Sequence, residues 1–332
     1  MISKFRSKRA LAVAAIVIAK CTTEIASAQA RIEIHPVETA TFSTQQFLVG
    51  SNTGRPTTLA AELRIPTLGP GKLPAVILVH GSAGLVAYHA RWANELNSIG
   101  VAALLLDSFT GRGITSTATD QSQLDSLAMM VDAYRALGML AQHPRIDASR
   151  IAVMGFSKGA VAAVYSSSDR FRKMHGPSNV QFAAHIGLYT PCYTMYRDDD
   201  KVTAKPIRLF HGIADDWVPI GPCRAYVRRL RDARVDVALT EYVGAHHTYD
   251  NFLLNEKPEP FGDGQIVGNC QLVEGDHGSI LNSKTGRPFY FNDECVERGA
   301  HLAYDEAATV STVKAVKEFL ATVFKLEVQT LH

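Results

Sequence analysis

The sequence predicts an α/β fold in which an open, mostly parallel sheet is covered by helices on both faces. Two observations support this. Predicted strands and helices alternate along the chain, and several strands are continuous apolar runs, such as PAVILVH at 74–80 and VAALLLD at 101–107. Alternation of this kind is typical of parallel α/β sheets. Continuous apolar runs are typical of strands that are buried on both faces.

The predicted elements follow one another in a regular order. Strands are expected at 46–50, 57–65, 74–80, 101–107, 150–156, 182–189, 207–212 and 235–243, with a hairpin at 51–56 joining the first two. Helices are expected at 87–99, 118–142, 222–234 and 305–324, with a further one beginning at Lys158. The segment 255–304 breaks this pattern because it is rich in Gly, Pro, Asn and Asp. A loop of this length is uncommon unless it is functional or cross-linked.

The composition excludes several classes of protein. Of 332 residues, 46% are hydrophobic and 20% are charged, and 34 Lys and Arg are nearly balanced by 32 Asp and Glu. Intrinsic disorder requires low hydrophobicity and high net charge, whereas the net charge here is +2. So small a charge gives no reason to expect a nucleic-acid partner. Beyond the N-terminus, no apolar run approaches the ~20 residues that span a bilayer.

The N-terminus has the three parts of a secretory signal peptide. Four basic residues precede the apolar run ALAVAAIVIA at 10–19, and Ala26-Ser27-Ala28 supplies a small-x-small cleavage pattern. We expect cleavage after Ala28, with Ala30 as the second choice and a short membrane anchor as the alternative reading. Residues 1–28 would then be removed, leaving no stable membrane anchor and a periplasmic or secreted protein. The remaining 29 basic and 31 acidic residues give it a net charge of −2.

Processing would leave four cysteines in a chain that we expect to form a single domain over 29–332. An even number of cysteines in an exported protein favours disulfides over free thiols. Four cysteines allow three connectivities, and proximity in sequence favours Cys192–Cys223 and Cys270–Cys295. The second pair would cross-link the irregular excursion at 255–304. Metal binding at these cysteines is disfavoured because they lack CxxC spacing and neighbouring histidines.

Ser157 is the candidate nucleophile, because it lies in the pattern Gly155-Phe156-Ser157-Lys158-Gly159. The pattern G-x-S-x-G is weak alone, but here it follows a predicted strand and opens a predicted helix. In that setting the serine occupies a sharp, strained turn, and flanking glycines avoid clashes within the turn. An ordinary glycine-rich strand–helix junction is the alternative reading.

A serine nucleophile needs a base and an acid that orients it. The loop after strand 207–212 offers Asp215 and Asp216, and the loop after strand 235–243 offers His246 and His247. Functional loops gather at the carboxyl ends of parallel strands, so these side chains are expected to meet Ser157. Solvated turn acids, and a packing or metal-binding histidine pair, are the alternatives.

The oxyanion of an acyl-transfer intermediate needs two backbone N–H donors. We expect one from Lys158, directly after the nucleophile at a helix N-terminus, with its side chain in solvent. The other is expected from Ser82, in the turn His80-Gly81-Ser82-Ala83-Gly84 that follows the strand at 74–80.

The residues that carry these motifs resemble the dienelactone hydrolase family of the α/β-hydrolase superfamily, in its secreted form. The resemblance rests on ILVHGSAG (77–84), LLLDSFTGRG (104–113), RIAVMGFSKGA (150–160), HGIADDWVP (211–219), GAHHTYDNF (244–252) and NDECVERGAHLAYD (292–305). It implies an α/β-hydrolase fold with a mostly parallel eight-stranded sheet. It also implies that Asp215, in D-x-x-V-P, and His247, in G-A-x-H, complete the triad. This chain has Ser157 where dienelactone hydrolase itself has a cysteine, which favours a general carboxylic ester over a dienelactone.

The sequence therefore predicts a secreted serine hydrolase that cleaves small-molecule or polymer-derived carboxylic esters without a cofactor or metal. A serine peptidase of the same fold and a catalytically silent hydrolase-like binding protein are the alternatives. The stretch 191–205 is too short for a folded lid domain. Candidate pocket residues, each of which could instead belong to the core or to an ion pair, are Tyr88, Phe109, Arg112, Tyr193 and Trp217.

Overall fold

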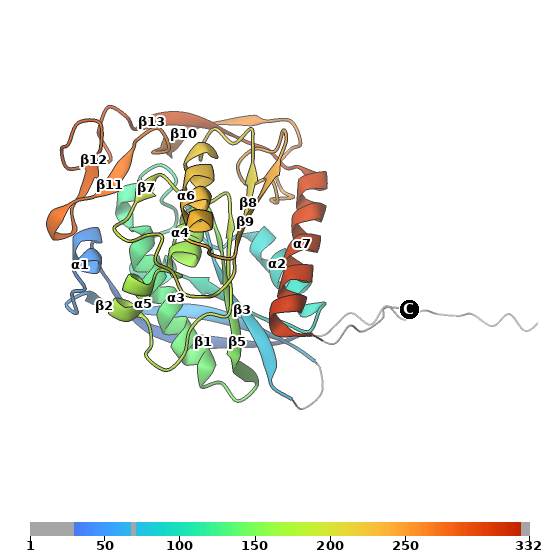
Figure 1. The fold of residues 1–332 in the computed structure, drawn as a ribbon. Helices are drawn as coiled ribbons and strands as arrows, with labels where there is room; N and C mark the ends of the chain where they lie inside the picture. Colours follow the sequence, from blue (N-terminus) through green and yellow to red (C-terminus); the bar gives the residue numbers. More distant parts are fainter. Residues whose placement is uncertain (1–29, 68–70, 327–332) are drawn as a thin grey trace, which may run out of the picture.

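A central eight-stranded sheet organises the computed structural model, which describes residues 30–67 and 71–326 (Figure 1). Its strand order is β1-β2-β4-β3-β5-β6-β8-β9. The strands are β1 (Ala30–Thr41), β2 (Arg55–Pro66), β3 (Leu73–Val79), β4 (Ala102–Asp107), β5 (Ile146–Phe156), β6 (His185–Leu188), β8 (Ile207–Gly212) and β9 (Val237–Tyr242). The pairs β1–β2 and β2–β4 are antiparallel, and the others are parallel. The predicted mostly parallel eight-stranded sheet is confirmed; the predicted signal peptide lies outside the described residues.

Helices cover both faces of this sheet, as predicted (Figure 1). The larger helices are α2 (Ala87–Asn97), α3 (Ser126–Ala141), α4 (Lys158–Tyr165), α6 (Gly221–Asp232) and α7 (Glu306–Phe324), and a shorter α5 spans Asp169–His175. Alternate residues of β3 enter opposite cores: Ile77 belongs to the core that includes residues of α3, α4 and α6, whereas Val76 belongs to the core that includes residues of α2 and α7. Among the described residues, no helix combines the length and apolarity needed to cross a membrane.

Residues 46–50, predicted as a strand, belong instead to a short helix, α1 (Thr44–Leu48). Ser43 and Gln46 form a reciprocal capping box that satisfies backbone N–H groups at its start. Phe47 and Leu48 are adjacent in sequence and both buried, a pattern that a strand with one buried face would not give. The predicted hairpin at 51–56 is therefore wrong; β2 pairs with β1, which the sequence analysis missed.

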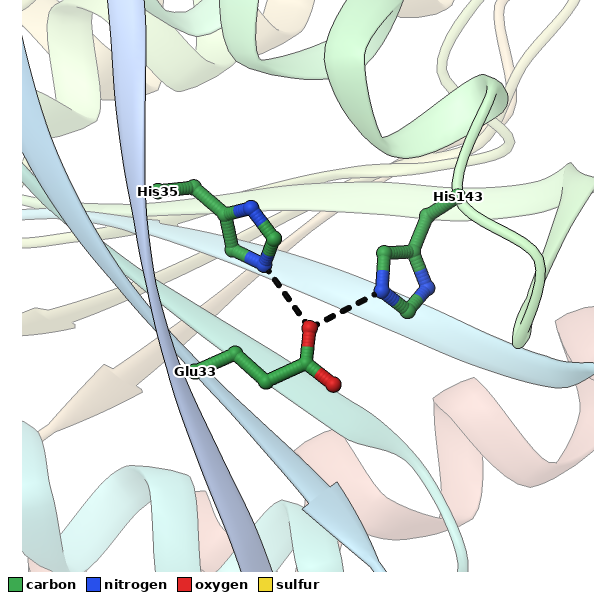
Figure 2. A group of neighbouring side chains, drawn as sticks. All are labelled: Glu33, His35 and His143. Carbon is green, nitrogen blue, oxygen red and sulfur yellow. Dashed lines mark hydrogen bonds and ion pairs between the residues drawn. The ribbon is translucent and has the colours of Figure 1, made fainter.

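The first half of β1 has an inverted pattern of burial. Ile32 and Ile34 are exposed, 58% and 67%, whereas Glu33 and His35 are half-buried. The buried Val37 lies on the same strand face as these polar residues, because side chains alternate along a strand. Glu33 and His35 meet His143 from the turn after α3 (Figure 2).

The excursion at 255–304 contains more regular structure than the sequence predicts. Strand β10 (Glu259–Ile266) pairs with β13 (Glu297–Leu302), and β11 (Leu272–Glu274) lies between β12 (Ile280–Asn282) and β7 (Thr194–Met195). A small apolar core forms around Val267, Cys270 and Leu272. The Cys270–Cys295 disulfide cross-links this region.

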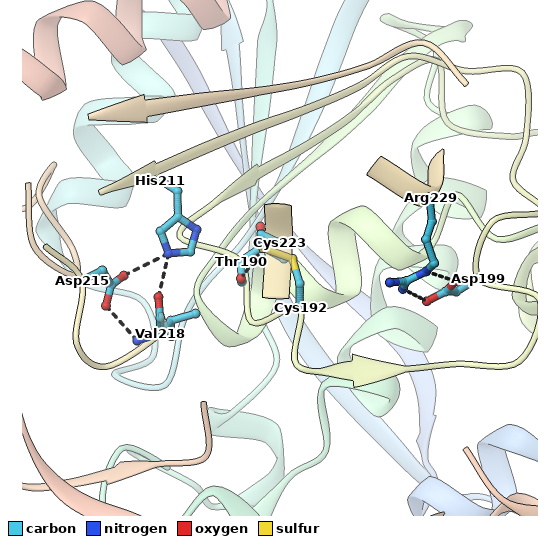
Figure 3. Close-up of a disulfide and its surroundings, with 8 residues drawn as sticks. All are labelled: Thr190, Cys192, Asp199, His211, Asp215, Val218, Cys223 and Arg229. Atoms are coloured by element: carbon cyan, nitrogen blue, oxygen red, sulfur yellow. Dashed lines mark hydrogen bonds and ion pairs between the residues drawn. A yellow bond between two sulfur atoms is a disulfide. The ribbon is translucent and has the colours of Figure 1, made fainter. Parts of the chain in front are cut away.

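A second disulfide, Cys192–Cys223, joins the segment after β6 to helix α6 (Figure 3). Both pairs are those that proximity in sequence favours. Cys192 precedes Tyr193 and Thr194, so the bridge anchors residues that lead into β7.

Candidate active site

Ser157 occupies a sharp turn between β5 and α4. Its φ is +50° and its ψ is −119°, a conformation that is uncommon for a residue with a side chain and costs on the order of 1–3 kcal/mol. The flanking glycines permit the turn: a Cβ on Gly155 would lie 2.1 Å from the carbonyl oxygen of Gly159, and one on Gly159 would lie 2.2 Å from that of Val79. The geometry matches the predicted strand–turn–helix setting.

The structure brings Ser157, His247 and Asp215 into one hydrogen-bonded chain. His247 Nε2 lies 2.9 Å from Ser157 Oγ, and His247 Nδ1 lies 2.7 Å from Asp215 Oδ2. Asp215 follows β8 and His247 follows β9, so loops at the carboxyl ends of neighbouring strands deliver both. The competing residues go elsewhere: Asp216 pairs with His301, 2.7 Å away, and neither it nor His246 joins this chain.

Asp215 is buried and remains ionised because several groups stabilise its charge. Its Oδ1 accepts hydrogen bonds from the backbone N–H groups of Trp217 and Val218. His211 Nε2 lies 3.4 Å from Oδ2 and donates to the carbonyl oxygen of Val218 (Figure 3). Burial alone would raise the pKa of Asp215, but His247 and the hydrogen bonds from His211 and His247 outweigh it and hold that pKa well below its usual range.

Ionised Asp215 determines the tautomer of His247. A carboxylate only accepts hydrogen bonds, so His247 Nδ1 carries the proton and Nε2 is left as an acceptor for the Ser157 hydroxyl. The His247 ring is 2% exposed at its side chain and packs between Tyr189 and Trp217, with ring centroids 4.7 and 5.1 Å away. The imidazole is thus held in the orientation that a general base needs.

A second buried carboxylate lies behind the histidine. Asp250 accepts hydrogen bonds from the Tyr189 hydroxyl at 2.9 Å and the Trp92 indole at 2.7 Å. Burial raises the pKa of Asp250 despite these bonds. Since the Tyr189 ring also packs against that of His247, with centroids 4.7 Å apart, this network helps to hold the imidazole in place.

Two backbone N–H groups lie beside the nucleophile. Lys158 is the first residue of α4, so its N–H has no acceptor within the helix. The Gly81 carbonyl oxygen accepts from His80 Nδ1 at 2.8 Å and from the Gly84 N–H. Because a trans peptide points its N–H away from its carbonyl, these bonds also orient the Ser82 N–H. A Cβ on Gly81 would lie 3.3 Å from Ser157 Cβ, which shows how close this turn is to the nucleophile.

The Lys158 side chain is buried, contrary to the prediction that it lies in solvent. Its Nζ donates to the Thr117 hydroxyl at 3.2 Å and to the Gln121 carbonyl oxygen at 2.9 Å. The Thr117 N–H in turn donates to the carbonyl oxygen of Ser82 at 2.8 Å. The predicted helix over 118–142 begins only at Ser126, capped by Asp125, which leaves this segment free to run past the nucleophile. Lys158 therefore connects the start of α4 to the turn that holds Ser82.

A cavity of about 350 Å³ opens at Ser157, Ser82 and Lys158. Of the five predicted pocket residues, Tyr193 and Trp217 line it. Much of the remaining wall comes from the excursion at 255–304, which the sequence analysis did not place at the site. Its contribution is Gln265, Val267, Leu272, Gly278, Ser279, Ile280, Pro288, Phe289, Tyr290 and Phe291.

Gln265 fastens the excursion to the site. Its side chain accepts from the Gln121 N–H at 2.7 Å and donates to the Phe291 carbonyl oxygen at 3.1 Å, and its own carbonyl oxygen accepts from the Trp217 indole. In the sequence, the only hints that this long irregular segment has a role were its two cysteines and its five Phe and Tyr residues. They do not indicate which surface the segment covers.

A comparison with known protein families assigns the chain to one of them. The model of the dienelactone hydrolase family matches residues 59–264, from β2 to β10. The chain belongs to the dienelactone hydrolase family. It is therefore a hydrolase, and the resemblance found in the sequence is confirmed.

Individual relatives of this dienelactone hydrolase family member are distant. It is 24% identical over 195 residues to a probable 2-oxo-3-(5-oxofuran-2-ylidene)propanoate lactonase from a Bradyrhizobium species, covering 54% of this chain and 74% of the relative. The structure of a dienelactone hydrolase-like promiscuous phosphotriesterase from metagenomic libraries superposes with a TM-score of 0.54, at 16% identity, over 88% of this chain and 98% of the other. The structure of an α/β-hydrolase enzyme from a Medee basin deep-sea metagenome library superposes with a TM-score of 0.50, at 16% identity, over 89% of this chain and 99% of the other. Both structures support the fold.

The other three predicted pocket residues lie in the core of this hydrolase. Tyr88 and Phe109 are 4% and 1% exposed and pack in the two apolar cores. Arg112 forms a bidentate ion pair with Asp132, both distances being 2.8 Å, with side chains 1% and 0% exposed. Its Nε and Nη1 also donate to the Thr41 hydroxyl and the Ser108 carbonyl oxygen. The prediction that Arg112 meets substrate is therefore wrong, because every donor it uses here points into the fold.

Asp132→Ala is expected to lower the free energy of unfolding by about 3–5 kcal/mol, because it leaves the Arg112 guanidinium buried without its counter-charge. Urea unfolding followed by circular dichroism measures this change. Glu318→Ala is the matched control, because Glu318 pairs with Lys314 on the surface and the two side chains are 68% and 75% exposed. Its free energy of unfolding should change by no more than about 0.5 kcal/mol. Equal losses in the two variants would contradict the assignment.

Proposed function

We propose that this protein hydrolyses carboxylic esters through an acyl-enzyme intermediate on Ser157. The observation that carries the proposal is the chain of hydrogen bonds from Ser157 Oγ through His247 to ionised Asp215, at 2.9 and 2.7 Å, with Ser157 lining a cavity. A serine, a correctly oriented imidazole and a buried carboxylate together are the groups that acyl transfer needs. Membership of a hydrolase family supports this reading over a silent binding protein.

Each residue has a defined part in the proposed reaction. His247 Nε2 takes the hydroxyl proton as Ser157 Oγ attacks the acyl carbon, and then returns it to the leaving alcohol. Asp215 keeps the Nδ1 proton in place and stabilises the imidazolium. The backbone N–H groups of Ser82 and Lys158 stabilise the oxyanion. Water then attacks the acyl-enzyme by the same steps and releases the acid.

The character of the cavity favours an ester with an apolar or aromatic part. Its lining combines the aromatic residues Tyr193, Trp217 and Phe291 with polar residues that include Gln121 and Asp125. A cavity of about 350 Å³ lies at the lower end of the range for sites that take small organic molecules. The relative described as a lactonase supports including cyclic esters among the substrates, since a lactone contains the same acyl–oxygen bond.

We also propose that the enzyme acts outside the cytoplasm. Support comes from the signal-like pattern in residues 1–28 and from two disulfides, which persist mainly in oxidising compartments.

Activity on a panel of p-nitrophenyl acyl and aryl esters, extended to lactones, tests the proposal. We expect turnover of at least one ester class, and a loss of about 10³-fold or more in kcat for Ser157→Ala, because residues of a triad act as a unit. Absence of turnover, or turnover that survives Ser157→Ala, would contradict the proposed nucleophile.

The two adjacent histidines provide an internal control. His247→Ala should lower kcat by about 10³-fold or more, because it removes the only imidazole within reach of Ser157 Oγ among the described residues. His246→Ala should change kcat less than about threefold, since the hydrogen bonds to Ser157 and Asp215 come from His247 and not from His246. Steady-state kinetics on the best ester measures both, and the reverse order would reassign the base.

Lys158→Met is expected to lower kcat about tenfold with little change in KM. The backbone N–H donor remains, but the hydrogen bonds from Nζ to the segment beside Ser82 are lost. The loss should be smaller than the ~10²–10³-fold seen when an oxyanion donor itself is removed. Lys201→Met, at an exposed lysine on another loop, should leave kcat unchanged.

The pH profile separates this positioning role from a packing role. Burial lowers the pKa of Lys158 to about 8, against the opposing influence of Asp125 and Asp120. The side chain is therefore a cation below that pH and loses its charge above it, which weakens its hydrogen bonds. The kcat of the unaltered enzyme should fall as pH rises through about 8, and Lys158→Met should lack this step. An identical alkaline step in both proteins would exclude Lys158 as its origin.

A further inference from the structure

Three metal-ligating side chains meet on the sheet away from the proposed catalytic loops. Glu33 and His35 lie on β1, and His143 lies in the turn between α3 and β5. Glu33 Oε2 is 2.9 Å from His35 Nε2 and 3.0 Å from His143 Nε2 (Figure 2). One ligand atom from each residue lies within 4.8 Å of the other two. His143 precedes β5, whereas Ser157 follows it, so the cluster and the nucleophile lie at opposite ends of that strand.

We propose that Glu33, His35 and His143 form a zinc site that ties the edge strand β1 to the turn after α3. Two imidazoles and one carboxylate are a ligand set that Zn²⁺ commonly uses. The two ligands on β1 are two residues apart, so they project from the same face of the strand. The third comes from a segment more than 100 residues later, so the ion would cross-link two distant parts of the chain.

The spacing of the ligand atoms suits one small cation. Two ligands that each lie about 2.0–2.1 Å from the same zinc ion are about 2.8–3.4 Å apart for bond angles of roughly 90–110°. The carboxylate-to-imidazole distances of 2.9 and 3.0 Å fall at the short end of that range. The two imidazole nitrogens lie within 4.8 Å of each other, and zinc binding would bring them to a separation of about 3.4 Å or less.

The electrostatics favour an ionised carboxylate at the centre of the cluster. Glu33 Oε2 accepts hydrogen bonds from His35 and His143 at 2.9 and 3.0 Å, so its charge faces both imidazoles. Arg31 pairs with Glu33 Oε1 at 2.9 Å, which leaves Oε2 directed at the histidines. Arg31 is 75% exposed, so solvent screens its repulsion of a bound cation.

Zinc binding requires a change of tautomer at His143. The Arg145 N–H donates to His143 Nδ1 at 3.2 Å, so neutral His143 carries its proton on Nε2 and donates it to Glu33. When zinc binds Nε2, that proton moves to Nδ1 and this long backbone hydrogen bond is replaced by the bond to the metal. A protonated imidazole has no free lone pair, so zinc also competes with protons for the two histidines.

The inverted burial of β1 is the independent observation that supports a role for these residues. Hydrophobic burial would place Ile32 and Ile34 inward, yet they are 58% and 67% exposed while Glu33 and His35 face the protein. A surface strand has no need of an inward-facing carboxylate between two imidazoles. A bound cation would attach this end of β1 to the turn that carries His143, where Ile32 and Ile34 of β1 do not pack inward.

Isothermal titration of ZnCl₂ into the EDTA-treated and dialysed Ser157→Ala protein tests the site. This background keeps the result separate from the proposed esterase activity. We expect one zinc ion per chain, and a rise in Tm of about 5 °C or more with free zinc at 100 times Kd. MgCl₂ should give neither, because magnesium prefers oxygen ligands. Lack of stoichiometric binding, or an equal response to magnesium, overturns the proposal.

Variants locate the ion. Glu33→Gln, His35→Gln and His143→Gln should each weaken zinc binding by at least about tenfold, whereas His277→Asn, at an exposed histidine elsewhere, should not. Undiminished binding in the three cluster variants places the ion elsewhere and overturns the assignment. If a cluster variant fails to fold, a titration of Co²⁺ into the protein with an intact cluster is used in place of that variant. Visible absorption of nitrogen-ligated cobalt, displaced by one equivalent of zinc, supports the site, and its absence overturns it.

Discussion

The sharp turn at Ser157 is the constraint on which the rest of the site depends. The turn can form because Gly155 and Gly159 have no side chains, which lets α4 approach β5 and β3 closely while Ser157 adopts its positive φ. The same close packing brings the turn containing Gly81 against Ser157. A single backbone geometry therefore places the Ser157 side chain at the cavity and gathers two candidate oxyanion donors around it. Strain concentrated at one residue of this kind is typical of functional sites.

The remaining groups are arranged by sheet topology and by burial. Neighbouring parallel strands β8 and β9 end at the same edge, so their loops deliver Asp215 and His247 to one place. Backbone N–H groups and His211 keep the buried carboxylate ionised, which in turn decides where the His247 proton resides. The excursion then closes one side of the cavity, held by Gln265 and by the disulfide Cys270–Cys295.

Much of the fold and the central part of the site could be predicted from the sequence. The apolar run that forms β3 is recognisable because a strand buried on both faces needs no polar alternation. Ser157 is recognisable because its turn requires glycines at fixed spacing. The helix α1 was missed because two adjacent apolar residues, Phe47 and Leu48, resemble a short strand, although the capping box from Ser43 to Gln46 was a usable signal.

By itself, the sequence determined what depends on neighbouring residues: the alternation of strands and helices, the nucleophile turn, and the order of Ser157, Asp215 and His247 along the chain. Tertiary structure alone decided which distant side chains meet. Arg112 turns inward to Asp132, Lys158 is buried against the segment beside Ser82, and the excursion forms a cavity wall. The physical reason is that backbone propensity and periodicity act over a few residues, whereas pairing of buried polar groups depends on packing between elements far apart in sequence.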